Sequence, residues 1–198
     1  MPEAETELEY QDPFELIVAV ILSAQCTDKR VNIITPALMK KFPDAKSMAK
    51  AEQSEIFSYI KSCSYPNSKA RYLSGMSKML IGEFNGQVPS DPAMLIKLPG
   101  VGRKTANVVS SVVFKKPVMA VDTHVFRVSA RIGLTRNAKT PGNAEDQLTK
   151  NIPSELIHKA YHWLLLHGRY ICKARNPLCS QCGITGFCKY YTDMNKKK

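Results

Sequence analysis

The chain has 198 residues, 44% of them hydrophobic, which is enough to bury a substantial core in one domain or in two small ones. Lys and Arg outnumber Asp and Glu by 28 to 17, and the net charge of +11 favours a polyanionic partner such as a nucleic acid. The longest apolar run, Leu16 to Ala24, is far below the roughly 20 residues of a membrane span, and the acidic start lacks the basic region of a signal peptide. We therefore expect no membrane partner and a cytoplasmic location.

The first half of the chain has the pattern of successive helices. Asp12 and Pro13 open the first with a cap and a proline at its first position, and it is apolar nearly all round to Leu22, as in a central buried helix. Caps and apolar spacing predict further helices at residues 28–42, 45–51, 53–60 and 67–81, the last of them ended by Gly82, and a short one at 91–97. No pair of strands is apparent, so we expect essentially no sheet.

A glycine-bearing hairpin then runs straight into a helix at Leu98-Pro99-Gly100-Val101-Gly102-Arg103-Lys104-Thr105-Ala106. Gly100 and Gly102 can adopt the positive φ of a sharp turn and let a phosphate approach the bare backbone. The helix that follows, through Arg103 and Thr105 to Phe114, offers unpaired N–H groups and its positive dipole end to the same phosphate. Such a turn can also be an ordinary connection between two helices. The residues beside it decide between a site that binds the DNA backbone and a loop with only a structural role.

That chemistry is an amine and a carboxylate. Lys104 falls in the first turn of the helix, where the dipole and Arg103 disfavour its protonated form, although partial burial in a cleft must add to these effects before the amine becomes a nucleophile. Asp122 precedes a helix start at Thr123, so it is either an ionised N-cap with a further role or only a cap. An amine and a fixed carboxylate suit attack on a sugar C1′, whose transition state carries oxocarbenium charge.

The C-terminal part contains two predicted helices and a cluster of thiols. Asn143 is expected to cap a helix to Asn151, and Ser154 a long one to about Gly168, whose histidines fit packing better than a metal site. The thiols follow the spacing C-x6-C-x2-C-x5-C, at Cys172, Cys179, Cys182 and Cys188. Four clustered thiols in a cytoplasmic chain indicate a metal centre rather than disulfides, and zinc or iron–sulfur would both accept them.

Four separated motifs resemble the endonuclease III family of helix-hairpin-helix DNA glycosylases, in register from about Glu7 to Tyr190. They are residues 98–106, 121–124, 22–25 and the cysteine array. The resemblance implies that Lys104 forms a Schiff base with the sugar of the damaged nucleotide and that Asp122 assists its attack. It also implies that Gln25 fills the gap left in the duplex and that the cysteines hold a 4Fe–4S cluster, with Lys173 and Arg175 projecting toward phosphate.

The same resemblance aligns residues 62–67 with a loop that enters DNA opposite the flipped base, which makes Tyr65 the inserted residue. Classical relatives usually carry leucine there, and an exposed loop tyrosine is otherwise commonplace. Relatives also usually begin with a further helix of about four turns. This chain is expected to start just after that helix and to leave an apolar face of its cluster lobe uncovered.

Taken together, these features predict an all-α, two-lobed protein. A helical barrel lobe, residues 12–116, carries the hairpin at 98–102 and Lys104; a cluster lobe, residues 1–11 and 117–198, carries Asp122 and the cysteine loop at 172–188. The active cleft is expected between the lobes.

The expected activity is that of a monomeric base-excision repair enzyme on double-stranded DNA, nucleoid-associated if bacterial. It removes oxidised pyrimidines as a DNA glycosylase and cuts at abasic sites as an AP lyase, by β-elimination. The alternatives are a mismatch-specific glycosylase of the same superfamily, or a non-catalytic DNA-binding or redox-sensing iron–sulfur module. Adenine excision is disfavoured because relatives that perform it lack a lysine at the position of Lys104.

Overall fold

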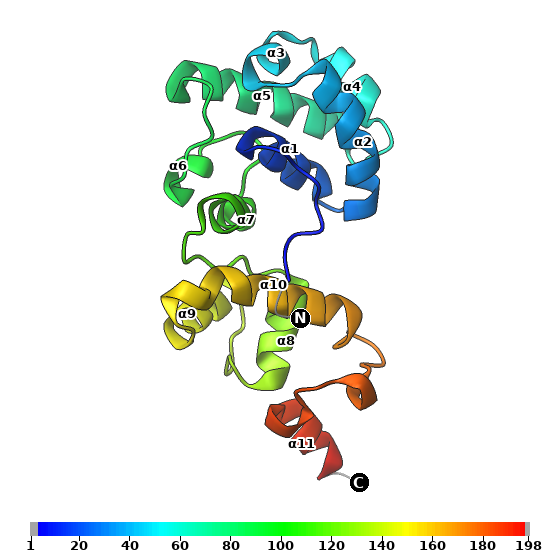
Figure 1. The fold of residues 1–198 in the computed structure, drawn as a ribbon, viewed down its shortest axis with the longest axis vertical. Coiled ribbons are helices and arrows are strands. Elements are labelled where there is room, and N and C mark those ends of the chain that lie inside the picture. The colour runs from blue at the N-terminus through cyan, green and yellow to red at the C-terminus, as the bar shows by residue number, and fades with distance from the viewer. Residues whose placement is uncertain (1–3, 197–198) are drawn as a thin grey trace. The chain divides into compact units, whose positions relative to one another are not determined.

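The structure, a computed structural model, describes residues 4–196; residues 1–3 of the predicted cluster lobe and 197–198 lie outside this description. All regular structure in the described part of the chain is helical, which confirms the predicted all-α class (Figure 1). No helix within it is both long and apolar enough to cross a membrane.

The chain divides into two compact units. Unit 2 comprises Thr6–Phe114, and unit 1 comprises Met1–Glu5 together with Lys115–Lys198. The sequence placed these boundaries at residues 11/12 and 116/117. The earlier start of unit 2 has a local cause in Asn32, whose side chain donates to Glu7 O at 2.8 Å and accepts from Glu9 N at 3.1 Å.

Unit 2 is organised around its first helix. Its elements are α1 (Pro13–Ser23), α2 (Asp28–Lys41), α3 (Ala45–Lys50), α4 (Gln53–Ile60), α5 (Pro66–Phe84), α6 (Pro92–Leu95) and α7 (Arg103–Phe114). Asp12 Oδ1 accepts from Glu15 N at 2.8 Å and so fixes the start of α1. Every residue from Leu16 to Leu22 is buried, and α1 lies against α2, α5 and α7 (Figure 1). The predicted central buried helix is confirmed.

Helix α5 differs from its prediction at both ends. It begins at Pro66 rather than residue 67, and it passes through Gly82 to Phe84, so the predicted stop at Gly82 is wrong. One glycine inside a helix costs only about 1 kcal/mol relative to alanine. The end is instead set by Asn85, whose φ of 51° is left-handed, and by Gly86 N, which donates to Leu80 O at 2.8 Å.

Unit 1 is built on two packed helices and a largely irregular C-terminal segment. Its elements are α8 (Thr123–Ile132), α9 (Pro141–Asn151), the 3₁₀ turn η1 (Ser154–Leu156), α10 (Ile157–Tyr170), the 3₁₀ turns η2 (Cys179–Gln181) and η3 (Thr185–Phe187), and α11 (Lys189–Asn195). Helix α8 packs on α10. The predicted cap Asn143 is wrong, because Thr140 Oγ1 accepts from Asn143 N at 3.1 Å and Pro141 takes the first helical position.

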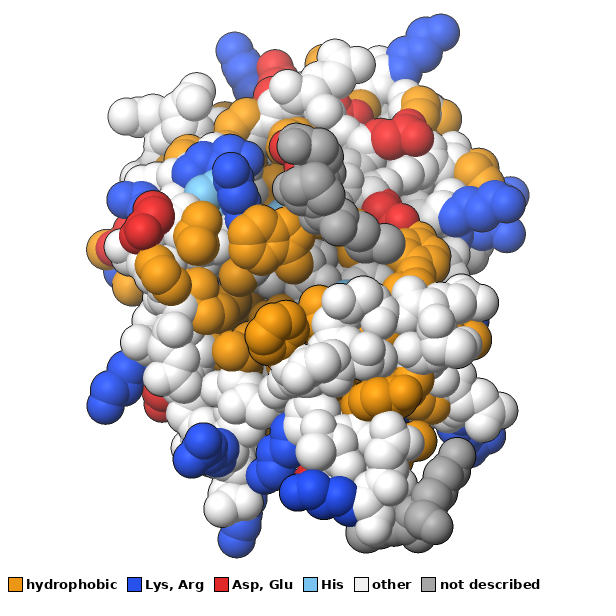
Figure 2. Space-filling view, turned by 60° about the horizontal axis from the view of Figure 1, so that its bottom comes forward, with side chains coloured by type: hydrophobic (Ala, Val, Ile, Leu, Met, Phe, Trp, Pro, Cys, Tyr) orange, Lys and Arg blue, Asp and Glu red, His pale blue; other side chains and the backbone are white. Residues whose placement is uncertain are grey.

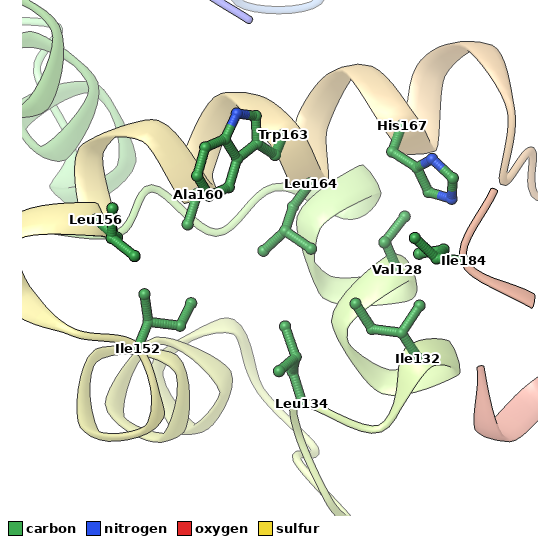
Figure 3. Close-up of a pocket in the computed structure, with 10 residues that line it drawn as sticks. All are labelled: Val128, Ile132, Leu134, Ile152, Leu156, Ala160, Trp163, Leu164, His167 and Ile184. Atoms are coloured by element: carbon green, nitrogen blue, oxygen red, sulfur yellow. The ribbon is translucent and has the colours of Figure 1, made fainter. Parts of the chain in front are cut away.

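Unit 1 carries an open apolar groove of about 580 Å³ between α8, α9 and α10 (Figure 3). Its lining consists of Val128, Ile132, Leu134, Ile152, Leu156, Ala160, Trp163, Leu164, His167 and Ile184. In the space-filling view, hydrophobic side chains gather around a hollow, and Lys and Arg side chains are spread over the face shown (Figure 2). The lining includes neither Asp122 nor a cysteine, but it shares Ile132, His167 and Ile184 with the cavity that the four predicted cysteine ligands line.

Candidate active site

The hairpin of unit 2 makes its sharp turn with one glycine. Val101 N donates to Leu98 O at 3.0 Å, and Gly100 has a φ of +80°, in the region that favours glycine. Gly102 does not have a positive φ, so the prediction that both glycines supply the turn is wrong. A Cβ built on Gly102 would meet nothing within 4 Å, which leaves this backbone open to an approaching group.

The hairpin is anchored on α5 rather than loosely tethered. Leu98 and Val101 are buried, with 2% and 5% of their surfaces exposed. A Cβ on Gly100 would lie 2.7 Å from the Cβ of Tyr72, and one on Gly75 would lie 3.2 Å from Pro99 Cγ. The closer of these approaches leaves no room for a side chain at Gly100, and the other leaves little room at Gly75. The position of the turn is therefore set by packing within unit 2.

Helix α7 starts directly after this turn and presents its first residues to solvent. Ala106 N donates to Gly102 O at 2.9 Å, which closes the first helical turn. Arg103 and Lys104 are exposed and Thr105 is half-buried. Unit 2 by itself therefore does not bury the Lys104 amine, and the partial burial in a cleft that the sequence analysis required stays a prediction.

Asp122 is the N-cap of α8 in unit 1, as predicted. Its backbone is extended, and Oδ1 accepts from His124 N at 2.9 Å and from Val125 N at 2.8 Å. These two backbone N–H donors fix the orientation of the carboxyl group. Both cap bonds use Oδ1, so the cap does not occupy Oδ2. Lys104 and Asp122 belong to different units, and their pairing across a cleft stays a prediction.

Four cysteines of unit 1 line a single cavity, together with apolar residues such as Ile132, Ile171 and Leu178. They are Cys172, Cys179, Cys182 and Cys188. Burial raises the pKa of the Cys179 thiol, and the other three thiols raise it further while Arg131 opposes them. No three His, Cys, Asp or Glu side chains within residues 4–196 are arranged to hold one metal ion. Thiols that surround a cavity suit a cluster with an iron atom at each ligand better than one zinc ion.

Two arginines of α8, which the sequence reasoning missed, hold the cysteine loop. Arg131 Nη1 lies 3.4 Å from Cys172 Sγ and donates to Lys173 O at 2.7 Å, and its guanidinium lies 4.6 Å from the centroid of the Tyr190 ring. Arg127 Nε donates to Cys172 O at 3.1 Å. Their spacing of four residues places both on one helix face, and this is the signal that the sequence offered. Cationic donors beside thiolates offset the negative charge of a four-thiolate site.

The histidines of α10 do not form a metal site of their own. His167 Nε2 lies 3.7 Å from Cys182 Sγ, and His162 is buried with Nδ1 making no hydrogen bond to any described residue. Burial lowers the pKa of His162 to about 4, and the positive charge of Lys115 acts in the same direction. The packing role preferred for these side chains agrees with this arrangement.

The remaining predicted contacts with DNA lie in two places. Gln25 and Tyr65 are brought together in unit 2, because Ser64 Oγ donates to Gln25 O at 2.6 Å. Both have a left-handed backbone, with a φ of 54°, and both side chains are exposed. In unit 1, Lys173 and Arg175 are exposed beside the cysteine loop.

Comparisons with known proteins cover nearly the whole chain. Residues 18–154 match the HhH-GPD superfamily of base excision DNA repair proteins, and residues 172–188 match the iron–sulfur binding domain of endonuclease III. The endonuclease III of Rickettsia conorii is 48% identical over 193 residues, which are 98% of this chain and 91% of the relative.

Two solved structures are similar in fold as well as sequence. A trapped endonuclease III–DNA covalent intermediate aligns with a TM-score of 0.91 at 43% identity and covers 98% of this chain and 91% of its own. A thermostable thymine-DNA glycosylase aligns with a TM-score of 0.84 at 25% identity, covering 93% and 87%. The similarity thus extends through both units.

Proposed function

The chain belongs to the HhH-GPD superfamily of base excision DNA repair proteins and within it to the endonuclease III family, and on this basis we propose that Lys104 is its nucleophile and that oxidised pyrimidines are its substrates. The protein is a bifunctional DNA glycosylase and AP lyase that acts on DNA and carries a 4Fe–4S cluster.

The observation that carries the assignment of Lys104 is its place at the start of α7, two residues after the open backbone of Gly102. A DNA phosphate held at that backbone and at the first N–H groups of α7 would bring the adjacent sugar to the lysine. Because Lys104 is exposed in the free protein, bound DNA must exclude water from the amine. That loss of hydration favours the neutral, nucleophilic form.

The proposed reaction has two stages. Nζ of Lys104 attacks C1′, the C1′–N bond breaks, and the base leaves with its electron pair and takes up a proton. The C1′–O4′ bond then opens, O4′ takes up a proton, and C1′ becomes the carbon of an iminium. This iminium loses a proton from C2′, and the electrons expel the 3′ phosphate in a β-elimination. Water then hydrolyses the imine and releases the lysine, so the net result is a free base and a strand cut 3′ to the lesion.

Asp122 supplies fixed negative charge in this scheme. Its carboxylate is held by two backbone N–H bonds through Oδ1, so Oδ2 can face the oxocarbenium charge that develops as the base departs. A preorganised charge of this kind costs no reorganisation at the moment of reaction. Asp122 is accordingly assigned to base loss more than to strand cleavage.

The other site residues have binding or structural roles in the proposal. Gln25 and Tyr65 fill the gap left by the flipped nucleotide, while the hairpin with Arg103 and Thr105, and the exposed Lys173 and Arg175, contact phosphates. The four cysteines would hold the 4Fe–4S cluster, which supplies thiolate–iron bonds that order a segment with only 3₁₀ turns. We further propose that the enzyme acts as a monomer.

Borohydride trapping on abasic duplex tests the assignment of Lys104. The wild type should form a covalent adduct, and Lys104→Gln should lose adduct and strand cleavage while still binding DNA; Lys97→Gln, at an exposed lysine before the hairpin, is the matched control. Normal cleavage by Lys104→Gln would refute the assignment. Binding without any cleavage by the wild type would instead favour a non-catalytic DNA-binding module.

A substrate panel tests the lesion class. We expect excision of oxidised pyrimidines to exceed that of mismatched thymine, the second candidate that the likeness to a thymine-DNA glycosylase suggests. The reverse order would assign the chain to the mismatch-specific group. Asp122→Asn, which keeps a capping oxygen, should slow base excision by roughly 10²–10³ and slow cleavage at a preformed abasic site less.

A further inference from the structure

Lys69 is the only Lys, Arg, Asp or Glu residue that is buried among residues 4–196. Only 4% of its surface is exposed. A buried ammonium is costly unless its protons are bonded. Here Nζ donates to Leu22 O and to Ala24 O, both at 2.8 Å. These carbonyls lie at the C-terminal end of α1, where a helix leaves carbonyls unpaired and carries partial negative charge. Lys69, a residue of α5, therefore caps α1.

Lys69 lies close to a second turn, since its backbone N–H makes the first bond of α5, to Tyr65 O at 3.1 Å. At that second turn, Ser64 Oγ donates to Gln25 O at 2.6 Å. We call residues 24–26 and 64–66 the insertion turns. About 40 residues separate them in sequence, yet two side chains at or just before the start of α5 join them: Ser64 donates to Gln25 O and Lys69 to Ala24 O. They form one structural element.

The backbone of each insertion turn is uncommon. Gln25 and Tyr65 have a φ of 54°, a left-handed conformation that non-glycine residues seldom adopt and that persists only where the surroundings fix it. Their side chains point away from the core, with Tyr65 64% exposed. Fixed backbones beneath exposed side chains are the arrangement expected of residues presented to a partner, because little order has to be gained on binding.

We propose that Lys69 is a positioning residue for lesion recognition: its buried ammonium, with the Ser64 hydroxyl, locks the two insertion turns together so that Gln25 and Tyr65 enter the gap in the duplex as a preformed pair. This rests on the assignment of those two residues to the gap. A charge that served stability alone would be a poor choice at a buried position, where an apolar side chain is often as good or better. The length of the lysine side chain and its several N–H donors allow one group to bond both carbonyls.

The test compares one abasic site in two settings. A duplex presents a gap and an opposite base, whereas a single strand presents neither, and the chemistry at Lys104 is common to both. Lys69→Met, which keeps the length and loses the donors, should lower kcat/KM on the duplex by about tenfold, since small misplacements of binding groups are costly. Cleavage of the single strand should stay within about twofold of wild type. Lys78→Met, at an exposed lysine of the same helix, should change neither.

The outcomes separate this proposal from the proposed function. If the wild type forms no borohydride adduct with either substrate, the assignment of Lys104 as the nucleophile is wrong. The proposed function is then refuted, and with it the role of Lys69 that rests on it. If the wild type reacts but Lys69→Met loses activity equally on both substrates, or on neither, the positioning role is wrong and the lysine is only a cap. If Lys69→Met does not fold, Ser64→Ala replaces it and should lower duplex cleavage about threefold with single-strand cleavage unchanged.

Discussion

The two units of this protein hold their functional residues by different means. In unit 2, Gly100 sits against Tyr72, Gln25 and Tyr65 are bonded through Ser64 and Lys69, and buried helices stand behind all of them. In unit 1, residues 172–188 contain only short 3₁₀ turns, are mostly exposed, and are bonded to α8 through arginine side chains.

This difference indicates where each geometry comes from. Packing and backbone hydrogen bonds are intrinsic to the polypeptide, so the insertion turns and the hairpin need no cofactor to form. A loop without a core gains its order from whatever its four thiols hold. The recognition elements should therefore survive loss of the cluster, and the single tryptophan, Trp163 in α10, provides a signal confined to unit 1.

The largest effect should follow Cys182→Ser. One lost thiolate leaves the cluster incompletely ligated, and we expect loss of the visible absorption together with an early unfolding transition of Trp163 fluorescence. Far-UV circular dichroism should retain a later transition from unit 2. Ser180→Ala, at an exposed position of the same loop, is the control. A single common transition in the variant would contradict the independence of the units.

A core truncation in unit 2 should produce the opposite pattern. Leu16 is fully buried at the centre of α1, so Leu16→Ala should destabilise unit 2 by about 2–5 kcal/mol through lost burial and a cavity. The circular dichroism transition should move while that of Trp163 stays. Ile33→Ala, at a residue that is 61% exposed in α2, should move neither. A matching shift of the Trp163 transition would show that the units unfold together.

The same division explains how much the sequence could reveal. Helix α1, the Asp122 cap and the cysteine spacing are local patterns in which composition and capping chemistry decide the outcome, and each was predicted from neighbouring residues. The left-handed backbone of Tyr65 and the extent of α5 were not, since glycine and proline signals alone do not reveal which tertiary contacts override them.

Polar contacts between residues far apart in the chain were also not predicted from the sequence. Arg127 and Arg131 contact carbonyls more than 40 residues further along the chain, and Lys69 contacts carbonyls 45 and 47 residues earlier. No periodicity encodes such partners. A lysine or arginine in a helix is expected at the solvent-facing side, so its burial becomes visible only in three dimensions.

Acid should weaken unit 1 more than unit 2. Burial lowers the pKa of His162 from 6.5 to about 4, with Lys115 and His158 acting in the same direction and Glu5 opposing them. In the unfolded chain His162 becomes protonated below about pH 6.5, whereas in the folded unit it becomes protonated only below about pH 4. The stability that neutral His162 provides is therefore complete above pH 6.5 and is lost between these values, by at most about 3 kcal/mol.

Trp163 fluorescence melts between pH 7 and 4 measure this loss. His162→Gln removes the titrating group, so its Trp163 transition should fall less steeply with pH than that of the wild type. His158→Gln, at a less buried position on the same helix, serves as the control. Parallel pH profiles for wild type and His162→Gln would place the acid sensitivity elsewhere.

The smallest change in stability should come from Gly102→Ala, which makes it the most specific probe of the hairpin. Gly102 has no positive φ, and its added Cβ would meet nothing within 4 Å, so the free energy of unfolding of unit 2 should change by no more than about 0.5 kcal/mol.

Gly100→Ala is the contrasting variant. At a φ of +80° its Cβ would lie 2.7 Å from Tyr72 Cβ, and the turn must distort. Both should weaken DNA binding, the first by obstructing the approach of a phosphate and the second by displacing the hairpin. Fluorescence anisotropy with undamaged and damaged duplexes, beside circular dichroism melts, separates the two causes. If Gly102→Ala binds both duplexes like the wild type, the open backbone at Gly102 is not the phosphate contact, and the first N–H groups of α7 must provide it without the turn.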